Sequence, residues 1–247
     1  MNLKNEQQIK LMREAGRLVA DTLDMLEDHV KPGVTTGDLD RIVEEYLRAH
    51  NATPSFKGYH GFTGSICASV NDVVVHGIPG DRMLYDGDII AIDVGAILNG
   101  WHGDSCRTYT VGTVDDESKR LMRVCEESLE IGIEYARAGN RLTDISYQIE
   151  QHVNAAGFAV VRDLFGHGIG RHMHEAPSLP HYGPAGDGPV LKPGLTITIE
   201  PMIVAGSPAV RSLDDGWTIV TLDGSRSAQY EHTIAITDNG PMILTLP

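Results

Sequence analysis

The second half of the chain repeats the first at an offset of 106 to 107 residues, and this repeat constrains the fold more than any other feature. Residues 33–39 correspond to 139–145, each a glycine turn followed by the start of a helix. Residues 59–61 correspond to 166–168, and 84–93 correspond to 191–200. We therefore expect two pseudo-symmetric halves, about 1–114 and 115–247, with a binding site where strand ends meet between them. Chance similarity is the alternative, because each match is short.

The order of the expected elements agrees with such a duplication. Hydrophobic periodicity predicts helices at about 5–29, 37–50, 115–138 and 142–156. Runs rich in β-branched residues predict strands at 89–92, 108–111, 196–199, 218–220 and 233–236. Helices and strands are thus expected in both halves, as in an α+β fold. No low-complexity linker separates the halves, which predicts a single catalytic domain of residues 1–247.

Composition excludes several classes of partner. The formal charge of −14 argues against nucleic acid or anionic lipid, because binding to either needs clustered Lys and Arg. No apolar run approaches the roughly 18 residues of a membrane span. The first residues resemble neither a secretory signal nor a transit peptide, and the three cysteines have no CxxC spacing, as expected of reduced thiols. These features predict a cytoplasmic protein.

Acidic residues stand at the ends of apolar strands. Asp93 follows the run 89–92, Glu200 follows 196–199, and Glu231 precedes 233–236. A buried carboxylate without a partner costs several kcal/mol, so each is expected to meet a cation, either Lys, Arg or a metal ion. For any one of them alone, hydrogen bonding at the surface is the alternative.

Two further residues favour metal ions. Asp93 and Asp104 are expected on adjacent antiparallel strands joined by a glycine-containing turn at 98–103, which brings their side chains close together. His167 lies between Gly166 and Gly168, where the backbone can approach an ion closely. No Lys-Ser or Lys-Thr pair follows this glycine-rich segment, which argues against a phosphate site. Four carboxylates and one imidazole suit two divalent ions of a hydrolase.

The order of these residues resembles that of the type I methionine aminopeptidases in their short bacterial form. The resemblance runs from the first helix to about residue 237 and is carried by the following segments: 71–79, Asp93, Asp104, 166–170, His174-Glu175, 198–202 and 229–233. It implies the pita-bread fold of creatinases and aminopeptidases, a curved antiparallel sheet covered by helices in two pseudo-symmetric halves. It also implies removal of the initiator methionine from nascent polypeptides with a small second residue.

The same resemblance implies a role for each metal-site residue. Asp93 would chelate one ion, Asp104 and Glu231 would bridge both, and His167 and Glu200 would complete the second ion's shell. A hydroxide bridging the ions would attack the scissile carbonyl. Co, Mn, Fe or Zn would all suit this set of ligands.

Catalytic and substrate-binding roles are implied in the same way. Glu200 would move a proton from the water to the leaving amine, His174 would stabilise the oxyanion, and His76 would contact the scissile amide or the following backbone. The pocket for the methionine side chain would be lined by Tyr59, Phe62, Cys67, Met173 and Trp217, with Met173 at a position where an aromatic residue is common. Core packing is the alternative for the lining residues.

A monovalent cation near Asn71 and Ser227 is also implied, with hydrogen bonding in turns as the alternative. Related enzymes that cut beside proline carry an additional N-terminal domain, whereas only about 70 residues precede the segment of His76 here. Only 26 residues separate His174 from Glu200, too few for the helical insertion of type II enzymes. Family members that have become binding modules lack several ligands, and all five are present here. We expect a monomer that acts on nascent chains, at the ribosome or after release.

Overall fold

The four helices form close to their predicted bounds in the computed structural model, which describes residues 1–247. They are α1 (Glu6–Glu27), α2 (Thr36–Ala49), α3 (Asp116–Tyr135) and α4 (Leu142–Ala155). Local capping explains where they begin. The side chain of Asn5 accepts a hydrogen bond from the amide of Gln8, and the Gln8 side chain accepts one from the amide of Asn5. Thr35 caps α2 in the same way.

The repeat is visible in the backbone of the two halves. Gly33 and Gly139 both have left-handed backbones, with φ of 90° and 94°. The Gly33 amide donates to the Leu84 carbonyl at 2.8 Å, and the Gly139 amide donates to the Leu191 carbonyl at 3.0 Å. Equivalent turns before α2 and α4 are therefore tied to equivalent segments before the central strands.

The central strands follow the same plan in both halves. In the first, β2 (Ile66–Val70) and β5 (Trp101–Thr110) pair with β4 (Ile89–Leu98), and β1 (Thr53–Pro54) pairs with the far end of β4. In the second, β7 (Gly166–Gly168) and β14 (His232–Thr237) pair with β9 (Thr196–Ile199), flanked by β8 (Glu175–Leu179) and β15 (Gly240–Ile243). The series β2, β4, β5 thus corresponds to β7, β9, β14.

Two small antiparallel sheets complete the fold. One contains β6 (Ala159–Val160), β10 (Met202–Val204) and β13 (Ser227–Gln229). The other contains β3 (Val73–Val75), β11 (Val210–Ser212) and β12 (Ile219–Thr221), and therefore joins a strand of the first half to a hairpin of the second. A short 3-10 turn, η1 (Tyr59–Gly61), precedes β2.

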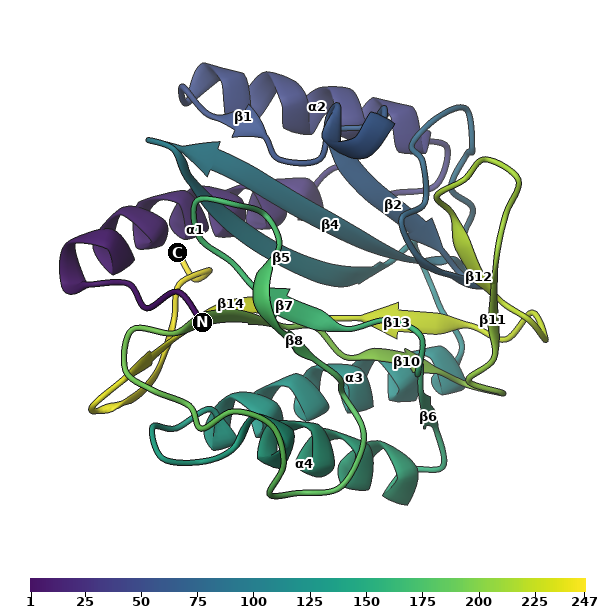
Figure 1. Cartoon of the computed structure of the whole chain (residues 1–247). Coiled ribbons are helices and arrows are strands. Elements are labelled where there is room, and N and C mark those ends of the chain that lie inside the picture. Colours follow the sequence, from purple (N-terminus) through teal and green to yellow (C-terminus); the bar gives the residue numbers. More distant parts are fainter.

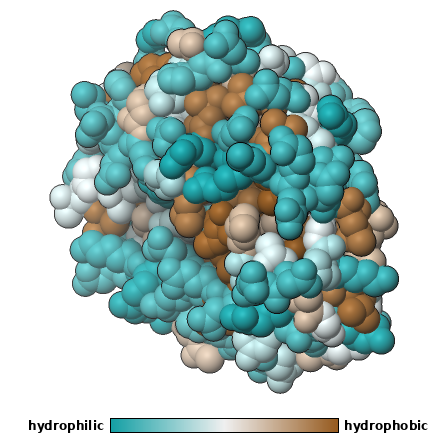
Figure 2. Space-filling view, turned by 90° about the vertical axis from the view of Figure 1, so that its left-hand side faces the viewer, coloured by the Kyte–Doolittle hydropathy of each residue, from teal (hydrophilic) through white to brown (hydrophobic).

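Each half has its own hydrophobic core under its own helices. One core contains residues between Leu18 and Val111, and the other contains Ile89 together with residues between Val114 and Ile236. Figure 1 shows α1 and α2 on the outer side of the first half and α3 and α4 on the outer side of the second, with the strands between them. The side on which α1 begins is largely hydrophilic, with hydrophobic surface showing near its middle (Figure 2). None of the helices has the length and apolar composition of a membrane span.

Polar side chains connect the two halves along β5. The amide of Glu231 donates to the carbonyl of Cys106 at 2.9 Å, and the hydroxyl of Thr108 donates to the carbonyl of Gln229 at 2.7 Å. The Thr233 hydroxyl accepts from the amide of Asp104 and donates to its carbonyl, at 3.2 and 2.8 Å. We call this row of contacts between β5 and residues 229–233 the seam.

Strand lengths differ from the sequence-based expectation. The β4–β5 hairpin is longer than predicted on both sides, because its turn is only Asn99-Gly100 and β5 begins at Trp101. His167 was expected in a loop but lies in β7. The three-residue strands β3, β10 and β13 were not predicted, because so short a segment has no readable period.

We predict that Gly103→Ala destabilises the protein, because α1 crosses β5 at this glycine. A Cβ atom on Gly103 would lie 2.7 Å from the Gly16 amide nitrogen of α1. Overpacking of this kind costs about 1–3 kcal/mol, or about 2–10 °C in melting temperature. Gly80→Ala is the control, because a Cβ there meets nothing within 4 Å. Equal melting temperatures for the two variants, measured by circular dichroism, would contradict the predicted close packing.

Candidate active site

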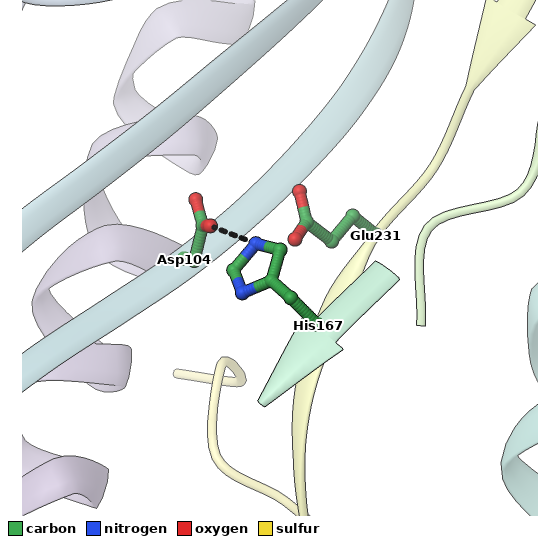
Figure 3. A group of neighbouring side chains, drawn as sticks. All are labelled: Asp104, His167 and Glu231. Carbon is green, nitrogen blue, oxygen red and sulfur yellow. Dashed lines mark ion pairs between the residues drawn. The ribbon is translucent and has the colours of Figure 1, made fainter. Parts of the chain in front are cut away.

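The five predicted metal ligands converge between the two halves. Asp93 lies in β4, Asp104 in β5, His167 in β7, Glu200 directly after β9, and Glu231 directly before β14. Nε2 of His167 is 3.7 Å from Oδ2 of Asp104 and 3.6 Å from Oε1 of Glu200. Figure 3 shows Asp104, His167 and Glu231 pointing toward one another, and their potential ligand atoms lie within 4.8 Å of each other.

Strand register explains why the two aspartates meet. Asp93 pairs with Cys106 across β4 and β5, and Asp104 pairs with Gly95. Side chains alternate along a strand, so Asp104 and Cys106 lie on the same face as Asp93. The two carboxylates are therefore diagonal neighbours, as the predicted hairpin required.

The imidazole of His167 is oriented by its own backbone neighbour. Its Nδ1 lies 2.9 Å from the Gly168 carbonyl, which can only accept, so Nδ1 carries the proton. Nε2 is then a lone-pair donor that faces the carboxylates. Burial, followed by the nearby His174, lowers the pKa of His167 to about 4, which keeps the ring neutral at neutral pH.

The carboxylates form a buried cluster whose oxygens lack partners. Oδ1 of Asp93, Oδ1 of Asp104 and Oε1 of Glu231 are buried and have no hydrogen-bond partner. Burial raises the pKa of Asp93 to about 7 and that of Glu200 to about 8. Burial and then the charge of Asp93 raise the pKa of Asp104, and burial and then Asp104 raise that of Glu231.

This donor set fits divalent metal ions. Buried polar groups are almost always satisfied, so the unpartnered oxygens around a lone-pair nitrogen call for cations. No lysine or arginine forms an ion pair with any of the four carboxylates. Carboxylate oxygens with one imidazole suit hard or borderline divalent ions, and a cation would lower the pKa of the carboxylates.

One cavity joins the carboxylate cluster to an apolar pocket. Its lining contains the five ligands together with the predicted residues Tyr59, Phe62, Cys67, His76, Met173, His174 and Trp217. Phe56, Phe62, Cys67 and Met173 are buried and pack into one hydrophobic cluster, against which Tyr59 and Trp217 also pack. The rings of Phe62 and Trp217 meet edge to face, with centroids 5.1 Å apart.

The two remaining predicted histidines border the same cavity. The Nδ1 atom of His174 is 2.7 Å from the hydroxyl of Tyr59, and its ring centroid is 4.2 Å from that of His167. Burial and then His174 lower the pKa of His76 to about 4. His76 has a φ of 57°, a left-handed conformation that is uncommon outside glycine and typical of functional sites.

Several lining residues were not predicted from the sequence, namely Phe56, Val75, Leu164, Phe165, Met202 and Gln229. Gln229 lies in the segment 229–233 that carries the family resemblance. Residue spacing along the sequence gives no sign that its Nε2 atom lies 3.4 Å from Oε2 of Glu200. His181 is fully buried behind the cluster and accepts from the Glu200 amide at 3.0 Å. No sequence signal marks His181. An aromatic-rich segment, 56–62, could have pointed to Phe56.

Asn71 and Ser227 also lie together. The Ser227 amide donates to the Asn71 carbonyl at 2.8 Å. The side chain of Asn71 donates to Asp88 at 2.8 Å and accepts from the amide of Ile89 at 3.1 Å. These bonds occupy the side chain of Asn71 in the way that the turn alternative requires.

Comparison with known proteins gives the family. The sequence matches metallopeptidase family M24 over residues 10–238. It is 55% identical to a methionine aminopeptidase of Clostridium perfringens, over 99% of this chain and 98% of that one. The chain belongs to the methionine aminopeptidases of family M24. The predicted family and enzyme class are thereby confirmed.

Solved structures agree with this assignment. The crystal structure of a methionine aminopeptidase from Rickettsia prowazekii superposes with a TM-score of 0.99 at 47% identity and covers all of both chains. A prolidase from Pyrococcus horikoshii shares the fold alone, with a TM-score of 0.81 at 23% identity over 98% of this chain and 63% of that one. The predicted pita-bread fold is therefore confirmed.

We predict that Asp104→Asn weakens metal binding without destabilising the metal-free protein. Because the pKa of Asp104 is raised in the folded state, its ionisation disfavours folding at any pH above its unfolded value, and Asn removes this penalty. At pH 8 with a chelator, the variant should melt at or above the wild-type temperature. Saturating Mn²⁺ should raise the wild-type melting temperature by about 5–10 °C and that of the variant by less than half as much.

Asp238→Asn, on the exposed β14–β15 turn, is the control and should respond to Mn²⁺ like the wild type. Differential scanning calorimetry provides the measurement. An Asp104→Asn variant that gained as much from Mn²⁺ as the wild type would exclude Asp104 from the metal site.

Proposed function

We propose that the chain hydrolyses the peptide bond after the initiator methionine of nascent polypeptides in the cytoplasm, with a small second residue preferred. The supporting observation is the single cavity that joins the buried carboxylates to an apolar pocket. Three free, buried cysteines are compatible with a reducing compartment.

Two divalent ions would be held by Asp93, Asp104, His167, Glu200 and Glu231. When bound, they would supply Lewis-acid activation of the water and of the scissile carbonyl. The aspartates are fixed by β4 and β5, and Glu231 is fixed by the hydrogen bond that its backbone amide donates to the Cys106 carbonyl across the seam. His167 presents Nε2 because Nδ1 is bonded to Gly168. Mn, Fe, Co and Zn remain candidates.

Glu200 would carry a proton between the attacking water and the leaving amine. Its Oε1 accepts from the Thr198 hydroxyl at 2.7 Å, and its Oε2 lies 3.4 Å from the Gln229 amide nitrogen. These two contacts restrict the carboxylate to one orientation. Burial raises its pKa to about 8 in the absence of metal, and bound cations would lower it.

Tyr59 and His174 together would stabilise negative charge on the substrate's carbonyl oxygen. If the Tyr59 hydroxyl donates to Nδ1 of His174, the remaining proton of the neutral ring lies on Nε2. Nε2–H is then a donor beside His167, where the oxyanion would develop. Tyr59 would therefore do more than line the pocket, the role that the sequence suggested.

His76 would bind the backbone of the substrate, and the apolar pocket would bind its methionine side chain. The His76 ring lies 6.0 Å from that of Trp217, centroid to centroid, so it stands where the pocket opens toward the ligands. Cys67 and Met173 offer polarisable sulfur, and Phe62 and Trp217 offer ring edges, for the thioether. For Asn71 and Ser227, the hydrogen bonds described above support the turn alternative, and a monovalent cation beside them stays a prediction.

We predict that metal removal abolishes activity and that peptide choice reveals the reaction. After treatment with a chelator, the protein is assayed with Met-Gly, Met-Leu and Ala-Pro peptides while each divalent ion is added back. Methionine release from Met-Gly, with much slower release from Met-Leu, is expected. Turnover of Ala-Pro alone would instead indicate a proline-specific enzyme. Folded protein without turnover of any peptide would indicate a binding module.

We predict that Glu200→Gln lowers kcat by about 10²–10⁴-fold, the usual effect of losing a general acid–base group. The variant should keep the circular dichroism spectrum of the wild type. Glu45→Gln, on the exposed face of α2, is the matched control and should retain full activity. An active Glu200→Gln variant would remove Glu200 from the mechanism.

A further inference from the structure

Lys4 is buried, although lysine is rarely buried without a partner. Its side chain is 2% exposed, and its Nζ atom lies 2.6 Å from Oε2 of Glu175, whose side chain is 8% exposed. Nζ also donates to the Asn2 carbonyl at 3.1 Å, and the backbone amide of Lys4 donates to the Gly194 carbonyl at 2.7 Å. The segment before α1 is therefore fixed against the second half, beside β7 and β14 (Figure 1).

The space for the Lys4 side chain is closed by two glycines. A Cβ on Gly170 would lie 2.6 Å from Cε of Lys4 and 2.7 Å from Oε1 of Glu175. A Cβ on Gly194, whose φ is 91°, would lie 2.5 Å from the Lys4 carbonyl oxygen. A side chain on Gly170 would displace the side chain of Lys4 or Glu175, and one on Gly194 would displace the backbone of Lys4, so both glycines leave room for the buried pair.

Glu175 connects this pair to the active site. It directly follows His174, and its Oε1 accepts from the amide of His172 at 3.3 Å. Residues 171–174 thus form a turn to which the Glu175 carboxylate is tied through the amide of His172. That turn carries Met173, a wall of the apolar pocket, and His174, whose ring stands 4.2 Å from His167.

We propose that Lys4 is a positioning residue for the reaction: it holds Glu175, and Glu175 holds the 171–174 turn so that Met173 and His174 face the substrate. The inference rests on the proposed function for its effect on rate. Without Lys4, the Glu175 carboxylate would be a buried charge without a cation and would turn toward solvent. The His172 amide would lose its acceptor, and His174 would lose its fixed place. A displacement of about 1 Å can cost roughly 100-fold in rate.

Three variants separate positioning from stability. Lys4→Met breaks the pair. Lys4→Met combined with Glu175→Met replaces both charges with apolar side chains, which for buried pairs is often neutral for stability. Arg13→Met is the matched control, because Arg13 also ties α1 to a distant segment, through the carbonyls of Leu244 and Pro247, but does not touch the turn.

The measurements are kcat and KM for Met-Gly peptides with saturating Mn²⁺, melting temperature, and hydrogen exchange of the His172 amide by NMR. We expect Lys4→Met to lower kcat/KM by about 10- to 100-fold and to speed exchange at His172. The double variant should regain the wild-type melting temperature while kcat/KM stays low and exchange stays fast. Arg13→Met should lower only the melting temperature.

A double-mutant cycle with His174→Ala identifies the residue through which Lys4 acts. If Lys4 works through the turn, Lys4→Met should lower kcat/KM much less in the His174→Ala background than in the wild type. Recovery of kcat/KM together with melting temperature in the double variant, or unchanged exchange at His172 in Lys4→Met, would overturn the proposal. The exchange result decides this even if the wild type releases no methionine, which would contradict the proposed function instead.

Discussion

The fold buries four carboxylates around one imidazole, and no cation of the protein itself offsets the unfavourable free energy of burying them. Oxygens of Asp93, Asp104 and Glu231 have no partner within the protein, and burial raises the pKa of every acid in the cluster. Sites of this kind are destabilising until cations fill them. The cluster lies between the halves and outside both hydrophobic cores. Apolar packing in these cores therefore offsets the destabilising burial of the carboxylates.

Contacts across the seam fix the positions of the carboxylates of the two halves relative to one another. The first half contributes Asp93 and Asp104 from within its central strands, and the second contributes Glu200 and Glu231 beside its own. These acids would shift relative to one another if the halves slid past each other. Hydrogen bonds from Thr108 and Thr233 to backbone atoms of the opposite half fix the register of β5 against residues 229–233. These polar contacts are directional where apolar packing would not be, so the positions of Asp104 and Glu231 follow from the backbone geometry of both halves.

Much of this was readable from the sequence, for identifiable reasons. The helices followed from hydrophobic periodicity, and the meeting of Asp93 with Asp104 followed from a hairpin; the caps at Asn5 and Thr35 explain where α1 and α2 begin. The repeat indicated where distant strand ends would converge. Contacts between segments far apart in sequence left no such signal: the Lys4–Glu175 pair spans 171 residues, and nothing in the first turn of the chain predicts it. Short strands such as β13 likewise depend on partners elsewhere.

Equivalent segments of the two halves contribute different residues to the cavity. Asp93 and Glu200 occupy equivalent positions in the repeat, and both belong to the carboxylate cluster that lines the cavity. His60 is the counterpart of His167 in the repeat, yet it is exposed at η1 with a φ of 46°, whereas His167 is buried among the carboxylates. The segment around His60 instead supplies Tyr59 and Phe62 to the apolar pocket. Equivalent strands of the two halves thus contribute Asp93 and Glu200 to the carboxylate cluster, while the segments around His60 and His167 differ: one lines the apolar pocket and the other lies among the carboxylates.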